Sequence, residues 1–276
     1  MKRKRLTEVF PWILPMRKKQ RTLCFYLHME LDGRQYAATV EKERLPYQLC
    51  QTCSPLYNHD TGFDMEYQEN KVFNLKLAGA KLDGLLLKPG ETFSFWKAVR
   101  YADKPVPYRK GLTVVNGALT AAPGGGLCQM SNLLFNLFLH SPLSILERRG
   151  HQKKEFPDPG DGPAGIDATV SEGWIDLKAE NRTAAAYQIG LDFDGQELKG
   201  YLLTDRLPKS RYEIRNGAIS YRREKDGVYQ KASVYRDCLD WETGKLQEEE
   251  KLYDNDCKIE YQLPECVLPE DGREKE

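Results

Sequence analysis

One cysteine stands where a helix is predicted to begin directly after a glycine-rich turn. The run 123–126 contains three consecutive glycines, Gly124, Gly125 and Gly126, and Cys128 follows two residues later. The positive end of a helix dipole stabilises a thiolate and can lower the pKa of a cysteine well below about 8.5. Free backbone N–H groups of the first turn can bind a developing oxyanion. The pattern indicates a nucleophilic cysteine; the alternative is a small buried cysteine packed under a glycine-rich loop.

Three polar side chains follow Cys128 in the same predicted helix: Gln129, Ser131 and Asn132. Ser131 and Asn132 come three and four residues after the cysteine, so they share its helix face. We expect these three residues and the three glycines to bind substrate, because glycine lets a substrate backbone approach closely. A phosphate-binding loop is less favoured, since no Lys-Ser or Lys-Thr pair follows the glycines.

A nucleophilic cysteine normally needs a base, and two residues downstream could complete a triad. His151 follows one predicted strand, and Asp167 lies on the polar face of the next. Cysteine, histidine, aspartate is the chain order of papain-like and transglutaminase-like thiol enzymes, in which histidine deprotonates the thiol and the carboxylate orients the ring. The alternative for His151 is a strand-end histidine bonded to backbone. His140 is a poorer base, because about 18 Å of helix would separate it from Cys128.

The elements that must position these residues follow from the spacing of apolar side chains. Helical spacing predicts a helix over 71–82, and the apolar segment 127–140 predicts a buried central helix. Apolar or alternating runs predict strands at 85–87, 92–96, 113–115, 143–149, 166–170, 174–179, 185–193 and 198–204. We therefore expect an α+β fold with a mixed or antiparallel sheet around the central helix.

The chain divides by composition into three parts. Residues 1–21 carry eight Lys and Arg against one Glu, which predicts a basic N-terminal arm. Residues 22–207 form the predicted α+β domain. Residues 208–276 are polar and tyrosine-rich, with Asn216-Gly217 and Asp226-Gly227 as hairpin turn signals, and predict a β-rich C-terminal appendage.

Charge and hydropathy exclude several classes of protein. The 41 Lys and Arg balance the 41 Asp and Glu, which argues against a nucleic-acid partner held by bulk charge. No run of about 18 apolar residues is present, and the apolar run 9–16 is broken by prolines and ends in a basic cluster, unlike a signal peptide. We expect a cytoplasmic protein or one peripheral at the inner membrane face, with an extracellular location as the alternative.

The basic arm and the cysteines suggest two further contacts. Residues 1–21, with Phe10, Trp12 and Ile13 among the charges, could rest on an anionic membrane; the alternative is a solvated arm docked by its aromatic residues. The odd count of seven cysteines favours reduced thiols. Cys24 with His28 and Cys50 with Cys53 could hold zinc, but the long gap between the pairs makes this pattern unspecific. We expect neither a metal nor another cofactor.

Successive blocks between residues 60 and 205 resemble those of the VanW family. The blocks are TGFD at 61–64, KVFNL at 71–75, LDG at 82–84, KPGETFSF at 88–95, PGGGLCQ at 123–129, ER with a following histidine at 147–151, and DATVS at 167–171. The resemblance implies a link to glycopeptide (vancomycin) resistance.

Multidomain proteins with VanW domains are thought to be cysteine-dependent L,D-transpeptidases that cross-link peptidoglycan stem peptides through their third residues. Their Gly-Gly-x-Cys-Gln block matches residues 125–129 here, so the resemblance implies that Cys128 attacks the carbonyl before a terminal D-Ala. The implied partner is a peptidoglycan stem peptide or precursor, and the implied activity is that of a thiol acyltransferase or peptidase. The alternative is a non-catalytic accessory protein that binds cell-wall precursors or partner resistance proteins.

Overall fold

The helix that carries Cys128 lies in the middle of the hydrophobic core. This helix, α5 (Leu127–Leu139), is apolar on nearly every side, and Leu134, Phe135 and Phe138 are fully buried. A second long helix, α3 (Met65–Leu82), packs against it. Both predicted helices are confirmed, although α3 begins earlier than its apolar stripe suggests. The computed structural model describes residues 10–58, 62–115, 118–154, 162–263 and 274–275.

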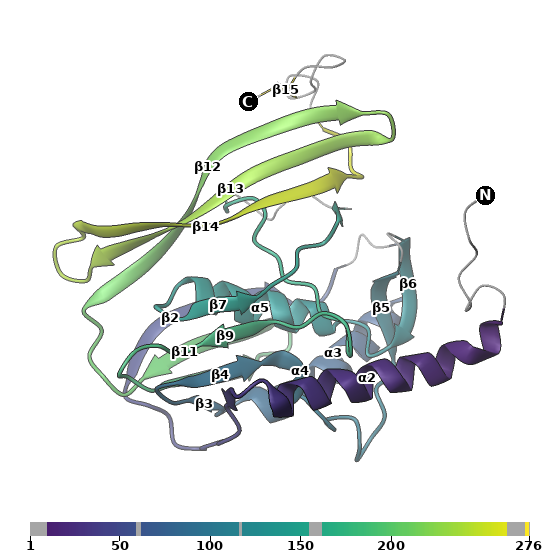
Figure 1. Cartoon of the computed structure of the whole chain (residues 1–276), viewed down its shortest axis with the longest axis horizontal. Helices are drawn as coiled ribbons and strands as arrows, with labels where there is room; N and C mark the ends of the chain where they lie inside the picture. The colour runs from purple at the N-terminus through teal and green to yellow at the C-terminus, as the bar shows by residue number, and fades with distance from the viewer. Residues whose placement is uncertain (1–9, 59–61, 116–117, 155–161, 264–273, 276) are drawn as a thin grey trace.

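Two four-stranded sheets flank the central helix (Figure 1). The first has the order β1-β4-β9-β7, formed by Gln35–Tyr36, Glu91–Ser94, Lys178–Glu180 and Ser144–Glu147. The second has the order β2-β11-β10-β3, formed by Tyr47–Pro55, Glu197–Thr204, Tyr187–Phe193 and Leu86–Leu87. Only the β1–β4 pairing is parallel in these two sheets. The predicted mixed α+β class is therefore confirmed.

The central helix sits tightly on the second sheet because one strand residue has no side chain. A Cβ atom at Gly200 of β11 would lie 2.7 Å from Leu133 and 3.0 Å from Leu137, both on α5. Such distances are shorter than van der Waals contact, so glycine lets helix and strand approach without displacing these two leucine side chains.

A hairpin leads directly into the glycine-rich turn. Strands β5 (Lys110–Val115) and β6 (Ala118–Pro123) pair in antiparallel register, and the chain turns from Pro123 through the glycines into α5. The sequence predicted part of β5 but not β6.

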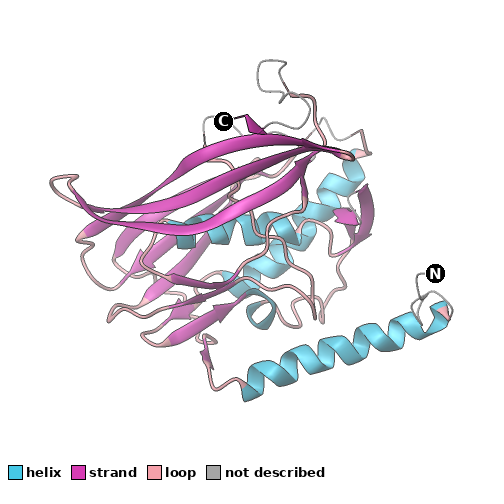
Figure 2. Cartoon of the chain, turned by 45° about the horizontal axis from the view of Figure 1, so that its top comes forward, coloured by secondary structure: helices cyan, strands magenta, loops and turns pink. Residues whose placement is uncertain are grey.

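The C-terminal part contains three long strands that extend across the molecule beyond the two smaller sheets (Figures 1 and 2). They are β12 (Ser210–Glu224), β13 (Gly227–Asp240) and β14 (Leu246–Ile259), joined at their ends by short β15 (Glu274–Lys275) and β8 (Lys153–Lys154). The Arg236 side chain of β13 donates hydrogen bonds to the carbonyls of Ser141 (2.6 Å) and Leu143 (3.0 Å), just after α5. The predicted β-rich character is confirmed, while the boundary at 207/208 stays a prediction.

Most predicted strands are confirmed with shifted ends, but two are wrong in part. The strand expected over 92–96 ends at Ser94, where the chain enters a short helix, α4 (Phe95–Ala98). The reason is local capping, since Ser94 Oγ accepts the N–H of Lys97 at 3.2 Å. The strand expected over 174–179 begins only at Lys178, because Trp174 lies in a turn closed by hydrogen bonds to Ser171.

Two further expectations are wrong because contacts with distant segments, and not a strand partner or a turn, decide the local backbone. Residues 166–170 are extended without joining a sheet: the N–H of Ala168 donates to Asn132 Oδ1 (2.7 Å) and that of Thr169 to the Arg149 carbonyl (2.8 Å). Asn216-Gly217 does not form a turn but lies inside β12 at an irregularity, where Asn216 bonds the backbone of Ala164. The turn at Asp226-Gly227 is confirmed.

The predicted basic arm is largely helical where the structure describes it. Residues 1–9 lie outside the described part, but Pro11–Ile13 form a 3-10 turn (η1) and Leu14–Leu31 form helix α2. Proline in the first turn and straight-chain residues after it favour a helix. Only Tyr26 and Met29 of this helix are buried. Among the described residues, no helix combines the length and apolar character needed to cross a membrane.

Candidate active site

The glycine-rich turn fixes the start of α5 through backbone contacts that exclude larger residues. Gly126, the residue before the helix, has φ = 101°, in the left-handed region. A Cβ at Gly125 would strike the backbone of Gly111, and one at Gly126 would strike the Lys71 side chain. Cys128 therefore lies in the first helical turn, as the sequence predicted. The N–H groups of its neighbours Leu127 and Gln129 already donate to the carbonyls of Gly124 (3.4 Å) and Gly126 (2.8 Å).

A buried asparagine clamps this turn. The side-chain amide of Asn74 on α3 donates to the carbonyls of Gly125 (3.0 Å) and Arg109 (2.9 Å) and accepts the N–H of Arg109 at 2.8 Å. Asn74 is fully buried. Because a trans peptide directs its C=O and N–H oppositely, fixing the Gly125 carbonyl also fixes the direction of the Gly126 N–H. The sequence signal for this clamping role of Asn74 is its place as a polar residue within the apolar stripe of α3.

The thiol of Cys128 is surrounded by hydrogen-bonding groups. Its Sγ lies 3.5 Å from Thr169 Oγ1 and 3.7 Å from the Val170 carbonyl oxygen, and it hydrogen-bonds to the side chain of His151. Burial alone raises the pKa of this thiol, but the hydrogen bonds to His151, Thr169 and the Val170 backbone together lower it below its ordinary value. The environment favours the thiolate.

His151 and Asp167 form a close pair, as the sequence predicted. The ring Nδ1 of His151 lies 2.6 Å from Oδ2 of Asp167, and the same oxygen accepts the backbone N–H of His151 at 2.6 Å. Burial lowers the pKa of His151, but the bonds to Asp167 and Cys128 raise it to about 10. The pKa of Asp167 is lowered, because the bond from His151 and the charge of Arg148 outweigh its burial. The shifts of all three groups thus favour their charged forms, which are thiolate, imidazolium and carboxylate.

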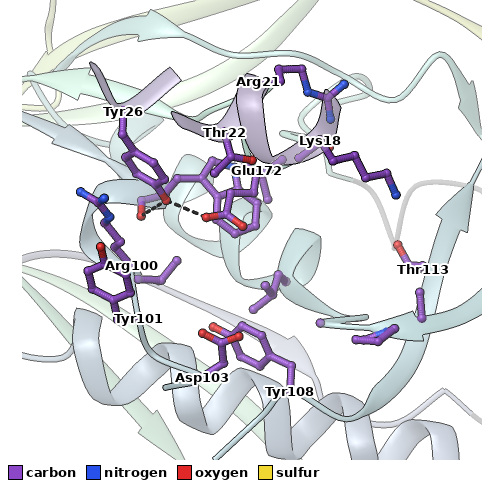
Figure 3. Close-up of a pocket in the computed structure, with 18 of the residues that line it drawn as sticks. Lys18, Arg21, Thr22, Tyr26, Arg100, Tyr101, Asp103, Tyr108, Thr113 and Glu172 are labelled. Carbon is purple, nitrogen blue, oxygen red and sulfur yellow. Dashed lines mark hydrogen bonds between the residues drawn. The ribbon is translucent and has the colours of Figure 1, made fainter. Parts of the chain in front are cut away.

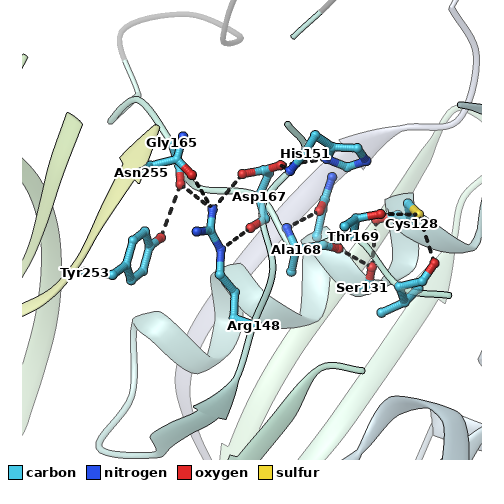
Figure 4. Close-up of polar contacts among 12 residues, drawn as sticks. Cys128, Ser131, Arg148, His151, Gly165, Asp167, Ala168, Thr169, Tyr253 and Asn255 are labelled. Carbon is cyan, nitrogen blue, oxygen red and sulfur yellow. Dashed lines mark hydrogen bonds and ion pairs between the residues drawn. The ribbon is translucent and has the colours of Figure 1, made fainter. Parts of the chain in front are cut away.

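An arginine that the sequence did not single out supports the carboxylate (Figure 4). Arg148 donates from Nη2 to Oδ1 of Asp167 at 2.7 Å and from Nε to the Asp167 carbonyl at 2.6 Å. Its guanidinium also donates to Asn255 Oδ1 at 3.0 Å and lies 4.3 Å from the centre of the Tyr253 ring. Both partners belong to β14, so the C-terminal strands contact the site, a contact that no local sequence pattern predicts.

The predicted substrate-binding side chains are engaged within the protein. Ser131 donates to the Ala168 carbonyl at 2.5 Å, and Asn132 accepts the N–H of Ala168 at 2.7 Å. Together they attach the segment that bears Asp167 to α5. Gln129 faces the other way and donates to Ser54 Oγ (2.9 Å) and the Pro55 carbonyl (2.7 Å) of β2.

A cavity of about 930 Å³ opens beside Cys128 (Figure 3). Gly124 and Leu127 contribute to its wall next to the thiol, and α2 supplies the opposite wall. Basic side chains of the lining are Lys18, Lys19, Arg21 and Arg100, whereas its acidic side chains are Asp103 and Glu172. The lining thus offers both signs of charge near the thiol.

Two tyrosines organise the polar part of this cavity. Tyr26 of α2 donates to Glu172 at 2.9 Å, and the Arg100 guanidinium lies 4.0 Å from the centre of its ring. Tyr108 packs over Gly124, and its buried hydroxyl has no hydrogen-bond partner among the described residues. Burial and the charges of Asp103 and Glu172 raise the pKa of Tyr108. Tyr108 therefore lines the cavity, while its hydroxyl oxygen is buried in the wall without a partner among the described residues and lies in a negative local field.

The remaining candidate residues lie apart from this site. His140 Nδ1 lies 2.9 Å from the Asn136 carbonyl at the far end of α5. Cys24 and His28 lie on α2, and Cys50 and Cys53 lie on β2; none of these three cysteines is in a disulfide. Within the described ranges, no group of three or more His, Cys, Asp or Glu side chains could hold a metal ion.

The comparisons with known proteins identify the family. The profile of a family described as VanW like protein matches residues 70–203. Vancomycin B-type resistance protein VanW of Enterococcus faecalis is 56% identical over 268 residues, which cover 97% of this chain and 98% of that protein. The chain belongs to the VanW family. The uncharacterized protein YoaR of Bacillus subtilis is 33% identical over 114 residues, 41% of this chain and 36% of that protein. No solved structure matches the chain.

The matched VanW segment contains most of the site but not all of it. Cys128, His151 and Asp167 lie within residues 70–203. Asn255 and Tyr253, which hold Arg148, and helix α2, which closes the cavity, lie outside that segment. In this VanW-family chain the site is thus completed by the N-terminal helix and the C-terminal strands.

Proposed function

We propose that this VanW-family chain is a cysteine-dependent acyltransferase or peptidase that acts on peptidoglycan stem peptides or their precursors and contributes to vancomycin resistance. The observation that carries the proposal is the hydrogen-bonded series Cys128, His151, Asp167 beside the cavity. The relative that is 56% identical to this chain, a vancomycin B-type resistance protein, supports the link to resistance.

The first half of the reaction forms a thioester. The Cys128 thiolate attacks the carbonyl that precedes a terminal D-Ala, and the oxyanion that develops is stabilised by the backbone N–H of Cys128 in the first turn of α5. The C–N bond then breaks, and His151 gives its proton to the departing amine of D-Ala. Because the pair starts as thiolate and imidazolium, no separate deprotonation of the thiol precedes the attack.

The second half releases the acyl group. An amine of a second stem peptide, or water, attacks the thioester, and His151 takes the proton that the nucleophile loses. The C–S bond breaks and restores the thiolate and imidazolium. An amine acceptor gives a cross-link, and water gives a shortened peptide, so the same residues serve an acyltransferase or a peptidase. Such a reaction uses a tetrapeptide and needs no D-Ala-D-Ala terminus.

Asp167 and its neighbours act as positioning residues in this scheme. Asp167 fixes the ring of His151 through Nδ1, which leaves Nε2 as the nitrogen that meets the thiol. Ser131 and Asn132 hold the segment that carries Asp167, and so we assign them a positioning role in place of the expected contact with substrate. The chain order of the three residues is that of papain-like and transglutaminase-like enzymes, and we propose a likeness of chemistry on that ground.

The charges of the cavity suit a peptide that bears both an amine and carboxylates. The α2 side of the lining is basic through Lys18, Lys19 and Arg21, which favours carboxylates. The Tyr108 hydroxyl, in the field of Asp103 and Glu172, favours a ligand ammonium. Peptidoglycan stems with a diamino acid at the third position carry both groups.

The decisive experiment measures D-Ala release from a tetrapeptide stem by the purified protein. We expect release by the wild type and its loss in Cys128→Ser, because a serine hydroxyl is not ionised by a neighbouring histidine in this setting. Cys53→Ser, which removes an exposed thiol, is the matched control and should retain activity. Tight tetrapeptide binding without release by the wild type would instead support the alternative, a non-catalytic protein that binds cell-wall precursors.

A further inference from the structure

Helix α2 presents a stripe of large apolar side chains to solvent, interrupted by Gln20. Trp12, just before the helix, is 70% exposed, Met16 is 65%, Leu23 is 69%, Leu27 is 51% and Leu31 is 74%. These positions are separated by four or seven residues, so they fall on one side of a helix. Large apolar side chains gathered on one exposed face mark an interaction surface.

The opposite face of α2 is the one that joins the protein. Tyr26 and Met29 are its buried residues, and the Tyr26 hydroxyl donates to Glu172. An ion pair between Lys97 and Glu30, 2.9 Å apart, also holds the C-terminal half, with Glu30 at the border of the stripe, three residues after Leu27. Figures 1 and 2 show the helix running along the outside of the molecule. The apolar stripe is therefore not used by the contacts that attach the helix.

The positive charge of residues 1–21 indicates which kind of partner surface can cover the stripe. Residues 1–21 carry eight Lys and Arg against one Glu, although the whole chain is neutral. Arg17 and Lys19 flank the stripe on α2. A second copy of the chain would bring two such basic segments together, whereas an anionic lipid surface would complement them.

We propose that α2 is an interfacial helix that docks on an anionic membrane through the stripe from Trp12 to Leu31. The predicted membrane contact of residues 1–21 thereby moves onto the helix and extends ten residues further along it. Charge attracts the helix to the headgroups, and the apolar stripe inserts among them. The two contributions can therefore be measured separately. Salt weakens the electrostatic attraction, and substitution of the apolar side chains weakens the insertion.

Docking would also place the cavity at the membrane surface. Lys18, Arg21, Thr22 and Tyr26 line the cavity from the same helix, and Leu23 of the stripe also belongs to the lining. A peptide anchored in that membrane could then reach Cys128 without leaving the surface, a consequence that rests on the proposed function. The docking itself does not depend on catalysis.

The test is co-sedimentation of the full chain with vesicles of phosphatidylcholine alone or mixed with anionic phosphatidylglycerol. We expect binding to the mixed vesicles that weakens as salt rises to about 1 M, where the Debye length is about 3 Å. Met16→Gln with Leu27→Gln should weaken binding by about tenfold or more through lost apolar burial. The matched control, Leu207→Gln with Leu246→Gln, removes two leucines that are 69% and 51% exposed elsewhere and should bind as the wild type does.

Two results would overturn the proposal. Equal sedimentation with neutral and anionic vesicles would show that no anionic surface is recognised. A dimer in light scattering that the stripe variant abolishes, together with unchanged vesicle binding, would assign the stripe to self-association. Circular dichroism melting of both double variants checks that folding is intact, and D-Ala release from a soluble tetrapeptide should be the same in both, which separates this outcome from failure of the enzymatic proposal.

Discussion

One carboxylate oxygen of Asp167 accepts hydrogen bonds from both the ring and the backbone N–H of His151. Oδ2 lies 2.6 Å from Nδ1 and 2.6 Å from the amide nitrogen of the same residue. The imidazole is thereby fixed in orientation and in the tautomer that carries its proton on Nδ1 when neutral. The other ring nitrogen is left for the Cys128 thiol, whose pKa is lowered by that contact.

The pH dependence of thiol alkylation should report this relationship. A lowered pKa of Cys128 means that the iodoacetamide rate reaches its plateau at a lower pH than for an ordinary cysteine. In His151→Ala the burial that raises the pKa persists without its main opposing contact, so the profile should move to higher pH and the rate at pH 7 should fall by about tenfold or more. Cys53, an exposed free thiol, supplies the reference profile in Cys128→Ser. An unshifted profile in His151→Ala would show that the two side chains are not coupled.

Arg148 should act on the site through Asp167 alone. Arg148→Lys keeps the charge but loses the forked donor geometry that binds both Asp167 and Asn255. We expect the pKa of His151, raised to about 10 in the wild type, to fall in an NMR titration, and kcat to fall by about 10-fold while KM changes little. Arg222→Lys is a matched control, because Arg222 of β12 also stacks on a tyrosine, but its ion pair is with Asp256 and not with Asp167. A drop in kcat with an unchanged His151 titration would contradict the positioning role.

Asn74 should stabilise the glycine-rich turn more than any surface residue. Asn74→Leu is close in size but leaves two carbonyls and one N–H without the partner that they have in the wild type. We expect the free energy of unfolding to fall by about 2–4 kcal/mol, measured by urea denaturation. Gln48→Leu, which removes an exposed side-chain hydrogen bond, should change it by about 0.5 kcal/mol or less. Equal effects of the two substitutions would refute the clamp.

Tyr108 should matter for ligand binding and not for stability. Its buried hydroxyl has no partner among the described residues, so Tyr108→Phe should leave the melting temperature unchanged or raise it slightly. Binding of a tetrapeptide with a free lysine amine should weaken by about 10-fold, measured by calorimetry in the Cys128→Ser background. The Nε-acetylated peptide should bind the two proteins equally. If both peptides lose affinity to the same extent, Tyr108 does not recognise the amine.

The local features of this chain were readable from its sequence. The start of α5 follows from two local signals. The glycines permit a left-handed turn, and the segment after them is apolar on nearly every side, as is typical of a buried helix. Strands β10 and β11 follow from alternation. Residue type and chain order sufficed to predict that His151 and Asp167 form a pair downstream of Cys128, and the structure brings this pair together. These signals succeed because turn chemistry and periodicity act between residues close in the chain.

The partners of the polar side chains were decided only by the tertiary structure. Ser131 and Asn132 lie on the predicted helix face, yet they bind Ala168, more than thirty residues away, because the chain returns there. Arg148 meets Asn255 across 107 positions of sequence, and no local pattern encodes that meeting. Residues 166–170 alternate like a strand but find side chains in place of a strand neighbour, so their extended form survives without a sheet. A hydrogen-bond partner depends on where distant segments cross, which periodicity does not determine.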